Sequence, residues 1–86
     1  MPEISRFFGI VVFLYPNDHE PPHFHARYAG RRVAIDIRTL RVMRGRIHPR
    51  ALGLLVEWAS LHQPELLAAW DVVRRSGTPD KIPPLG

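Results

Sequence analysis

The chain has 86 residues, carries a net charge of +4, is 45% hydrophobic and contains no cysteine. This length corresponds to one domain with a single core of modest size. Without cysteine the chain forms neither disulfides nor a thiolate metal site. No apolar run approaches the roughly 20 residues that span a bilayer, and the first residues lack a signal-peptide pattern. The sequence therefore predicts a cytoplasmic protein that does not engage a membrane.

The positive charge is concentrated in one segment. Residues 27–50 hold eight arginines against a single acid, Asp36, which gives a net charge of +7 there and −3 in the remainder. A basic segment beside an acidic remainder favours an anionic partner, either RNA or DNA or an acidic protein. Alternating arginines are also typical of a solvated strand face. The side chains predicted to contact the partner are Arg27, Arg31, Arg32, Arg38 and Arg41.

The N-terminal part is predicted to form β-strands. Residues 7–15 are apolar, β-branched and aromatic, which indicates one central strand with Gly9 inside it. Pro16-Asn17-Asp18 ends this strand and begins a loop that runs through Pro22.

A β-hairpin is predicted next. Residues 23–28 and 31–38 alternate between polar and apolar side chains, and Ala29-Gly30 joins them as a two-residue turn. Alanine fits poorly at the first central position of such a turn, which requires a positive φ. A short edge strand over 40–43 follows, and it leaves strand pairing between two copies of the chain open.

The two-residue turn sets the register of this hairpin. Tyr28 then pairs with Arg31, and the apolar side chains share one face while His23, His25 and Asp36 share the other. The expected pairs further along are Arg27 with Arg32, Ala26 with Val33, His25 with Ala34, Phe24 with Ile35 and His23 with Asp36.

The second half is predicted to be a helical hairpin over about residues 49–76. Pro49 and Pro64 lie in the first turns, and apolar residues recur near the 3.6-residue period. The tail, 77–86, is expected to be extended and docked by Ile82 and Leu85. The predicted fold class is α+β: a single domain, 1–86, with an antiparallel sheet of three to four strands over about 4–47, followed by a two-helix hairpin packed on one face.

The densest chemistry lies in residues 18–25, Asp-His-Glu-Pro-Pro-His-Phe-His. Alternate residues of a strand point to the same side, so His23 and His25 project together, and His19 folds back from the loop to join them. Imidazoles with a nearby carboxylate are ligands for Zn, Ni or Cu. The predicted ligands are His19, His23 and His25, with Asp18, Glu20 and Asp36 as further candidates.

The same residues also suit a metal-free acid–base site. His23 or His25 would move protons, and Asp36 would raise the imidazole pKa or orient its tautomer. Arg27 and Arg32 would hold a phosphate, so the enzymatic hypothesis is a hydrolase that acts on RNA. The alternative interpretation is an exposed polar hairpin face whose ion pair contributes about 0–1 kcal/mol.

Six short motifs occur along the chain in a recognisable combination. They are Met-Pro-x-Ile-Ser-Arg-Phe at the start, Asp-His-x-Pro-Pro-His-Phe-His at 18–25, Arg-Ala-Leu at 50–52, Glu-Trp-Ala at 57–59, Leu-His at 61–62 and Lys-Ile-x-Pro-Leu at 81–85. Together they resemble one small prokaryotic family, the domain-of-unknown-function family numbered four-one-six-zero. The resemblance implies short proteins encoded in two-gene pairs with toxin–antitoxin-like roles, and no established biochemistry. Segment 39–46 is more basic here than the acid-containing version of the family, so contact with nucleic acid through arginine would be particular to this chain.

Three functional hypotheses follow from these observations. The first is a small bacterial binding module, one half of a toxin–antitoxin-like pair, that contacts a small protein partner or RNA through the basic hairpin. It is favoured because it requires only the charge asymmetry and the family resemblance. The second is a divalent-metal protein centred on His19, His23 and His25, and the third is a small ribonuclease that uses these histidines.

Overall fold

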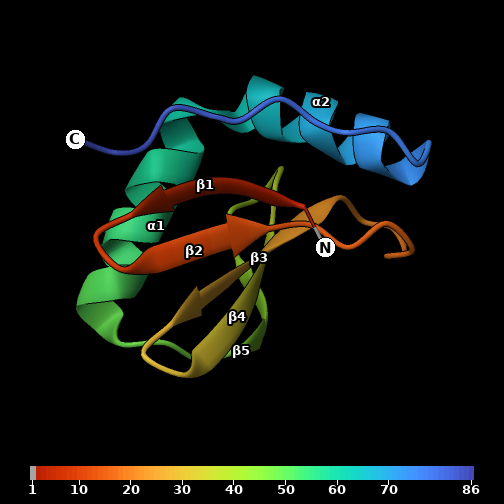
Figure 1. The fold of residues 1–86 in the computed structure, drawn as a ribbon. Helices are drawn as coiled ribbons and strands as arrows, with labels where there is room; N and C mark the ends of the chain where they lie inside the picture. The colour runs from red at the N-terminus through yellow and green to blue at the C-terminus, as the bar shows by residue number, and fades with distance from the viewer. Residues whose placement is uncertain (1) are drawn as a thin grey trace.

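The computed structural model describes residues 2–86 as an antiparallel sheet of five strands in the order β1-β2-β3-β4-β5, followed by two helices (Figure 1). The predicted α+β class is confirmed, with five strands in place of three to four. Within residues 2–86, no helix is long and apolar enough to cross a membrane. The elements are β1 Glu3–Phe7, β2 Ile10–Phe13, β3 His23–Tyr28, β4 Arg31–Asp36, β5 Val42–Gly45, α1 Pro49–Leu61 and α2 Gln63–Arg74.

The first apolar segment forms two strands where the sequence predicted one. Phe8 and Gly9 have φ values of 49° and 79°, the positive values that a two-residue hairpin turn requires. Strands β1 and β2 pair antiparallel around this turn, with Phe7 opposite Ile10. The turn was missed because Phe8 is an aromatic residue, a type that is common in strands, and it continues the apolar run. In the structure Phe8 is 61% exposed.

The hairpin of β3 and β4 has the predicted register at all six positions, from His23 opposite Asp36 to Tyr28 opposite Arg31. Ala29 and Gly30 have φ values of 50° and 78°, so alanine does occupy the unfavourable position. The inward side chains of this hairpin are fully or almost fully buried. They are Phe24, Ala26, Val33 and Ile35.

Replacing Ala29 by asparagine is expected to raise the free energy of unfolding by about 0.5–1 kcal/mol, because asparagine tolerates a positive φ better than alanine. Ala29 is exposed, so no packing changes. Urea unfolding monitored by circular dichroism measures the effect. Ala29→Val is the matched control: its β-branched side chain disfavours positive φ, so it must destabilise the protein for this explanation to hold.

The two helices supply the other half of the core. Helix α1 lies behind β1 and β2 in the view of Figure 1, and α2 crosses the top at a steep angle to it. One residue, His62, joins them, so the helices meet at a corner and do not lie side by side. Trp58 is fully buried, whereas Leu61 at the end of α1 is 63% exposed. The buried helical residues are Ala51, Leu55, Trp58 and Ala59 in α1 and Leu66, Ala69, Trp70 and Val73 in α2.

One edge strand of the sheet, β1, is covered by the C-terminal tail, whereas the other, β5, is exposed. The C-terminal tail runs back along α2 (Figure 1), and the Ile82 N–H donates to the Ile4 carbonyl of edge strand β1 at 2.8 Å. Docking of the tail through Ile82 and Leu85 is confirmed. The opposite edge strand, β5, begins at Val42, two residues after the predicted start, and all four of its residues are exposed. An exposed edge of this kind is available for pairing, and a homo-oligomer stays a prediction.

Candidate functional site

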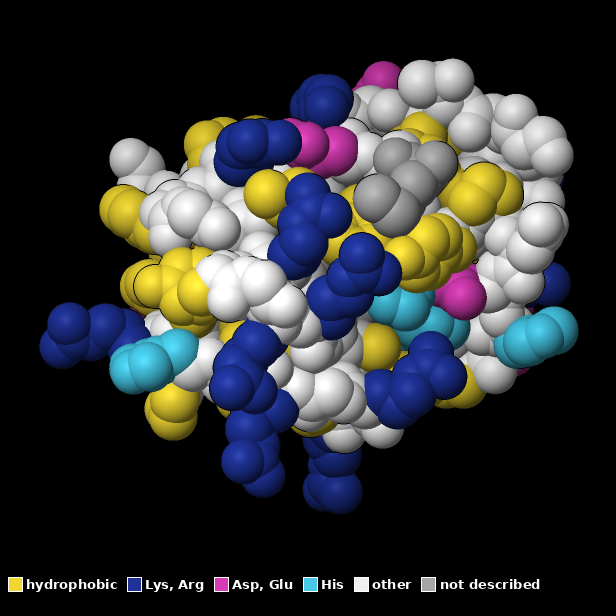
Figure 2. Space-filling model, turned by 60° about the horizontal axis from the view of Figure 1, so that its bottom comes forward, with side chains coloured by type: hydrophobic (Ala, Val, Ile, Leu, Met, Phe, Trp, Pro, Cys, Tyr) yellow, Lys and Arg dark blue, Asp and Glu magenta, His cyan; other side chains and the backbone are white. Residues whose placement is uncertain are grey.

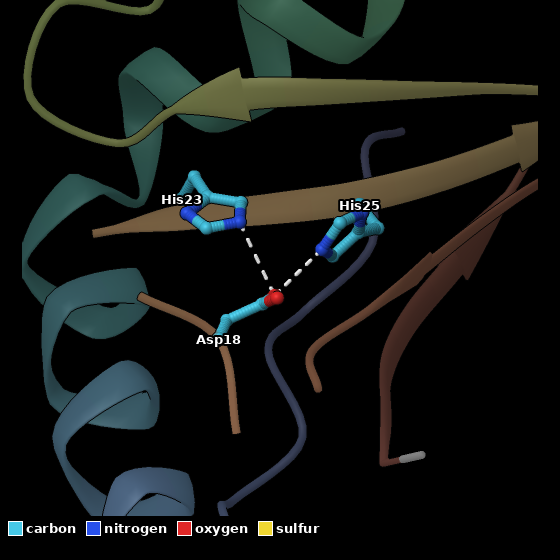
Figure 3. A group of neighbouring side chains, drawn as sticks. All are labelled: Asp18, His23 and His25. Carbon is cyan, nitrogen blue, oxygen red and sulfur yellow. Dashed lines mark hydrogen bonds and ion pairs between the residues drawn. The ribbon is translucent and has the colours of Figure 1, made fainter. Parts of the chain in front are cut away.

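The loop between β2 and β3 places Asp18 against the two histidines of β3. Asp18 Oδ2 lies 2.7 Å from His25 Nε2 and 3.2 Å from His23 Nε2. Figure 3 shows the Asp18 carboxylate pointing between the two imidazoles, which project from the same side of β3. An ion pair between Glu20 and Arg74 ties the loop to α2. We call this group the Asp18–His23–His25 cluster.

His23 is held rigidly in this cluster. It is 3% exposed, and its ring lies 5.2 Å from the ring of Trp70 in α2. Its Nδ1 lies 2.8 Å from the Pro21 carbonyl oxygen. A carbonyl only accepts, so Nδ1 carries the proton and donates. Its Nε2 is buried and has no hydrogen-bond partner, since the 3.2 Å approach of Asp18 is not aligned as a hydrogen bond.

His25 lies between two aromatic rings. The Phe13 ring stacks on it at a centroid distance of 5.5 Å, and Tyr15 meets it edge-on at 4.6 Å. Burial lowers the pKa of His25 below its ordinary value of 6.5, and the hydrogen bond to Asp18 offsets this only in part. The imidazole is therefore uncharged at neutral pH, and its Nε2–H donates to Asp18.

Three arginines lie on the same face of the sheet as His25. Arg27 and Arg32 are directly opposite each other on β3 and β4, and Arg44 on β5 is opposite Ala34, the partner of His25. Figure 2 shows basic side chains spread over one face of the molecule, with histidines recessed beside an acidic side chain. We call Arg27, Arg32 and Arg44 the arginine face.

Aromatic side chains contact Arg27 and Arg32, the two arginines that face each other on this surface. The Arg27 guanidinium lies over the Phe13 ring, 5.9 Å from its centroid, and Arg32 Nη1 donates to the Tyr15 hydroxyl at 3.2 Å. Within residues 2–86, none of the eight arginines in segment 27–50 forms an ion pair with an acid. The neighbouring Arg6, by contrast, pairs with Glu3 and lowers the pKa of that carboxyl. The aromatic contacts position the guanidinium groups and leave their charge uncompensated.

A shallow groove runs between His25 of the cluster and two residues of the arginine face, Arg32 and Arg44. It is lined by Tyr15, His25, Arg32, Ala34 and Arg44, among others, and the small side chain of Ala34 leaves room between the two arginines. A second groove, on the other side of Arg44, opens over the Asp18–His23–His25 cluster and is lined by Asp18, His19, Glu20, His23, Met43 and Arg44.

The remaining predicted site residues lie elsewhere. Asp36 is opposite His23 along the backbone, but its carboxylate accepts the N–H groups of Arg38 and Thr39, at 2.8 and 2.9 Å. It therefore caps the turn after β4 and does not orient His23, contrary to the prediction.

The other predicted partner-binding arginines lie away from the cluster. Arg31 lines a different hollow, near the start of α1. Arg38 lies in the turn between β4 and β5, Arg41 follows this turn, and both are exposed.

The structure places His19 outside the cluster and brings two further residues to the site. His19 is exposed and lines the groove over the cluster, and Asp18, predicted as a further candidate ligand, lies against His23 and His25. Tyr15 and Arg44 were not predicted as site residues. The register of β4 with β5 would have identified Arg44, but the edge strand was placed two residues too early. Tyr15 lies two residues after Phe13, which pairs with His25, and both rings contact His25. The pairing of β2 with β3 sets this position, and that register was not predicted from the sequence.

Chemically, the site offers a charged surface and a polar cluster. Guanidinium groups beside the half-buried rings of Tyr15 and His25 suit a phosphate with an attached base. The Asp18–His23–His25 cluster offers three ligand atoms within 4.8 Å of one another. Proton transfer by His23 or His25 to an RNA substrate stays a prediction.

Comparison with known proteins adds one finding. A model of the family described as a domain of unknown function, DUF4160, matches residues 9–71. The match contains the whole candidate site, whereas the motifs at the start of the chain and in the tail lie outside it. The family predicted from the motifs is confirmed. No curated protein matches the chain, and no solved structure matches it.

Proposed function

Because this chain belongs to the DUF4160 family, a domain of unknown function, we propose its role from its own surface: it is a small module that binds single-stranded RNA on the arginine face. One observation carries the proposal. Eight arginines in segment 27–50 have no acidic partner within residues 2–86, and three of them share one face of the sheet.

The energetics favour an anionic ligand on this face. Like charges directly opposite each other on neighbouring strands are destabilising, and here Arg27 faces Arg32. A bound phosphate chain would neutralise both charges and release its own condensed counterions, which is the main driving force of nucleic-acid binding. The groove between Arg32 and Arg44 is the place where a phosphate would contact two guanidinium groups.

The aromatic neighbours favour RNA over an acidic protein. Tyr15 and His25 line the same groove as Arg32 and Arg44. Unstacked bases of single strands pack on aromatic rings and guanidinium planes, whereas an acidic peptide offers no such group. The two-gene, toxin–antitoxin-like setting that the family resemblance implies supports an additional small protein partner.

Neutralising the arginine face is expected to weaken RNA binding. The variant Arg27→Gln/Arg32→Gln/Arg44→Gln should bind a labelled single-stranded RNA of about 20 nucleotides at least about tenfold more weakly than the wild type in 100 mM salt. Loss of three phosphate contacts should also reduce the slope of log affinity against log salt by about 2. Fluorescence anisotropy in the presence of a chelator measures both quantities.

The matched control removes the same charge elsewhere. Arg38→Gln/Arg41→Gln/Arg50→Gln also neutralises three exposed arginines, and we expect its affinity to stay within about threefold of wild type because distant surface charges are screened at this ionic strength. Equal losses in both variants would contradict a defined RNA surface. Binding of an acidic polypeptide in preference to RNA would replace the RNA proposal with an acidic protein partner.

A further inference from the structure

We propose that Asp18, His23 and His25 bind a divalent transition-metal ion such as Zn²⁺ through Asp18 Oδ2, His23 Nε2 and His25 Nε2. This inference goes beyond RNA binding and does not depend on it. It rests on the geometry of the cluster, on the fixed tautomer of His23 and on the groove above the three ligand atoms.

The tautomer of His23 is the strongest argument. Its Nδ1–H is committed to the Pro21 carbonyl at 2.8 Å, so a neutral ring presents a lone pair at Nε2. Metal-binding histidines are commonly oriented in this way, with the second nitrogen donating to a carbonyl or carboxylate. The Nε2 of His23 is buried, lacks a hydrogen bond and lies 3.2 Å from Asp18 Oδ2. Two acceptors that face each other at this distance repel unless a cation or a proton lies between them.

The spacing of the ligand atoms suits a small ion. Ligand atoms at about 2.0–2.2 Å from a tetrahedral Zn²⁺ are about 3.3–3.6 Å apart. The His23–Asp18 distance of 3.2 Å is close to that value, and the three atoms lie within 4.8 Å of one another. The His25–Asp18 distance of 2.7 Å is a hydrogen bond that must open slightly as the imidazole changes tautomer and offers Nε2.

The site also has an entrance and an open position. The groove lined by Asp18, His19, Glu20, His23 and Arg44 reaches the cluster from solvent. Three protein ligands leave the fourth position for water or another small ligand, the arrangement of an open metal site. A divalent ion with one carboxylate and two neutral imidazoles carries a net charge of +1, and Arg44 nearby adds to it. The fourth ligand is therefore expected to be an anion, such as a phosphate oxygen.

The test uses the untagged full chain, purified without a nickel column and stripped with a chelator. Titration calorimetry with Zn²⁺ alone at pH 7.5 should give one equivalent. Asp18→Asn and His25→Gln should each weaken binding by at least about 100-fold. The matched controls Asp80→Asn and His48→Gln, which remove the same groups outside the cluster, should stay within about threefold. Circular dichroism of each metal-free variant checks that it is folded.

A measurement on the wild type does not depend on any variant. In NMR spectra of the imidazole nitrogens, Zn²⁺ should shift Nε2 of His23 and of His25 and leave His48 and His62 unchanged. Binding weaker than about 10 μM that is equal in wild type and Asp18→Asn would show adventitious binding and overturn the proposal. So would a loss of binding in His19→Ala with full binding in Asp18→Asn, because the ligands would then be the three histidines.

Discussion

Replacing Trp58 by alanine is expected to lower the free energy of unfolding by about 3–5 kcal/mol, a large share of the stability of a domain of this size. Trp58 is 0% exposed and lies at the junction of α1 with the sheet. Its ring centroid is 5.2 Å from that of Phe7 and 6.0 Å from that of Phe24. Its Nε1–H donates to the Pro83 carbonyl at 2.8 Å. The substitution therefore leaves a cavity and also releases the tail.

The two tryptophans provide a control that separates the hydrogen bond from the packing. Trp70 is also buried, but its Nε1 has no partner. We expect Trp58→Phe to be more destabilising than Trp70→Phe by about 1 kcal/mol, the net contribution of one hydrogen bond. Urea unfolding monitored by far-UV circular dichroism gives both values. Equal losses would show that the contact with Pro83 contributes nothing, and that Trp58 acts through its volume alone.

Replacing Gly45 by alanine is expected to destabilise the protein by about 2–4 kcal/mol, because a methyl group has no space at this position. Gly45 has a φ of 82°, and a Cβ there would lie 2.2 Å from the Arg32 carbonyl oxygen, which belongs to the backbone of β4. That oxygen also accepts the Arg46 N–H at 3.0 Å. The added atom must push β5 away from β4 and displace Arg44, so RNA affinity should fall together with stability.

Gly30 isolates the contribution of the backbone conformation. It has a similar φ of 78°, but a Cβ there would meet nothing within 4 Å. Gly30→Ala should therefore lose only the conformational term, about 1–2 kcal/mol. Thermal or urea unfolding of the two variants gives the difference. If Gly45→Ala is no less stable than Gly30→Ala, the close approach of β4 and β5 does not exclude a side chain at position 45.

The hairpin of β3 and β4 was predictable because its information is local. Alternating side chains and a two-residue turn allow one register that keeps Phe24 and Ile35 on the core face. That register correctly placed Arg27 opposite Arg32. The same logic failed at Phe8-Gly9, where an aromatic residue occupies a turn and the apolar pattern runs through it.

The candidate site was predictable only in part, for the same reason. His23 and His25 are two residues apart on one strand, so strand geometry alone brings them together. The position of Asp18 depends on the path of an irregular loop, which an ion pair from Glu20 to Arg74 of α2 helps to set. Asp36 appeared to be the partner of His23 because it pairs with it along the backbone. The Asp36 carboxylate instead accepts hydrogen bonds from the N–H groups of the turn that follows. The strand register does not show that these N–H groups compete with His23 for the carboxylate.

By itself, the sequence determined the α+β class, the central hairpin, the basic segment and the histidine pair, because each depends on periodicity, turn chemistry or composition over a few neighbouring residues. Only the tertiary structure decided which carboxylate faces the histidines, that Arg44 of β5 shares a face with Arg27 and Arg32, and which nitrogen of His23 is left without a partner. These features depend on contacts between residues far apart in the chain, such as Trp70 against His23 and Tyr15 against Arg32. Packing of the whole chain creates such contacts, and no local pattern encodes them.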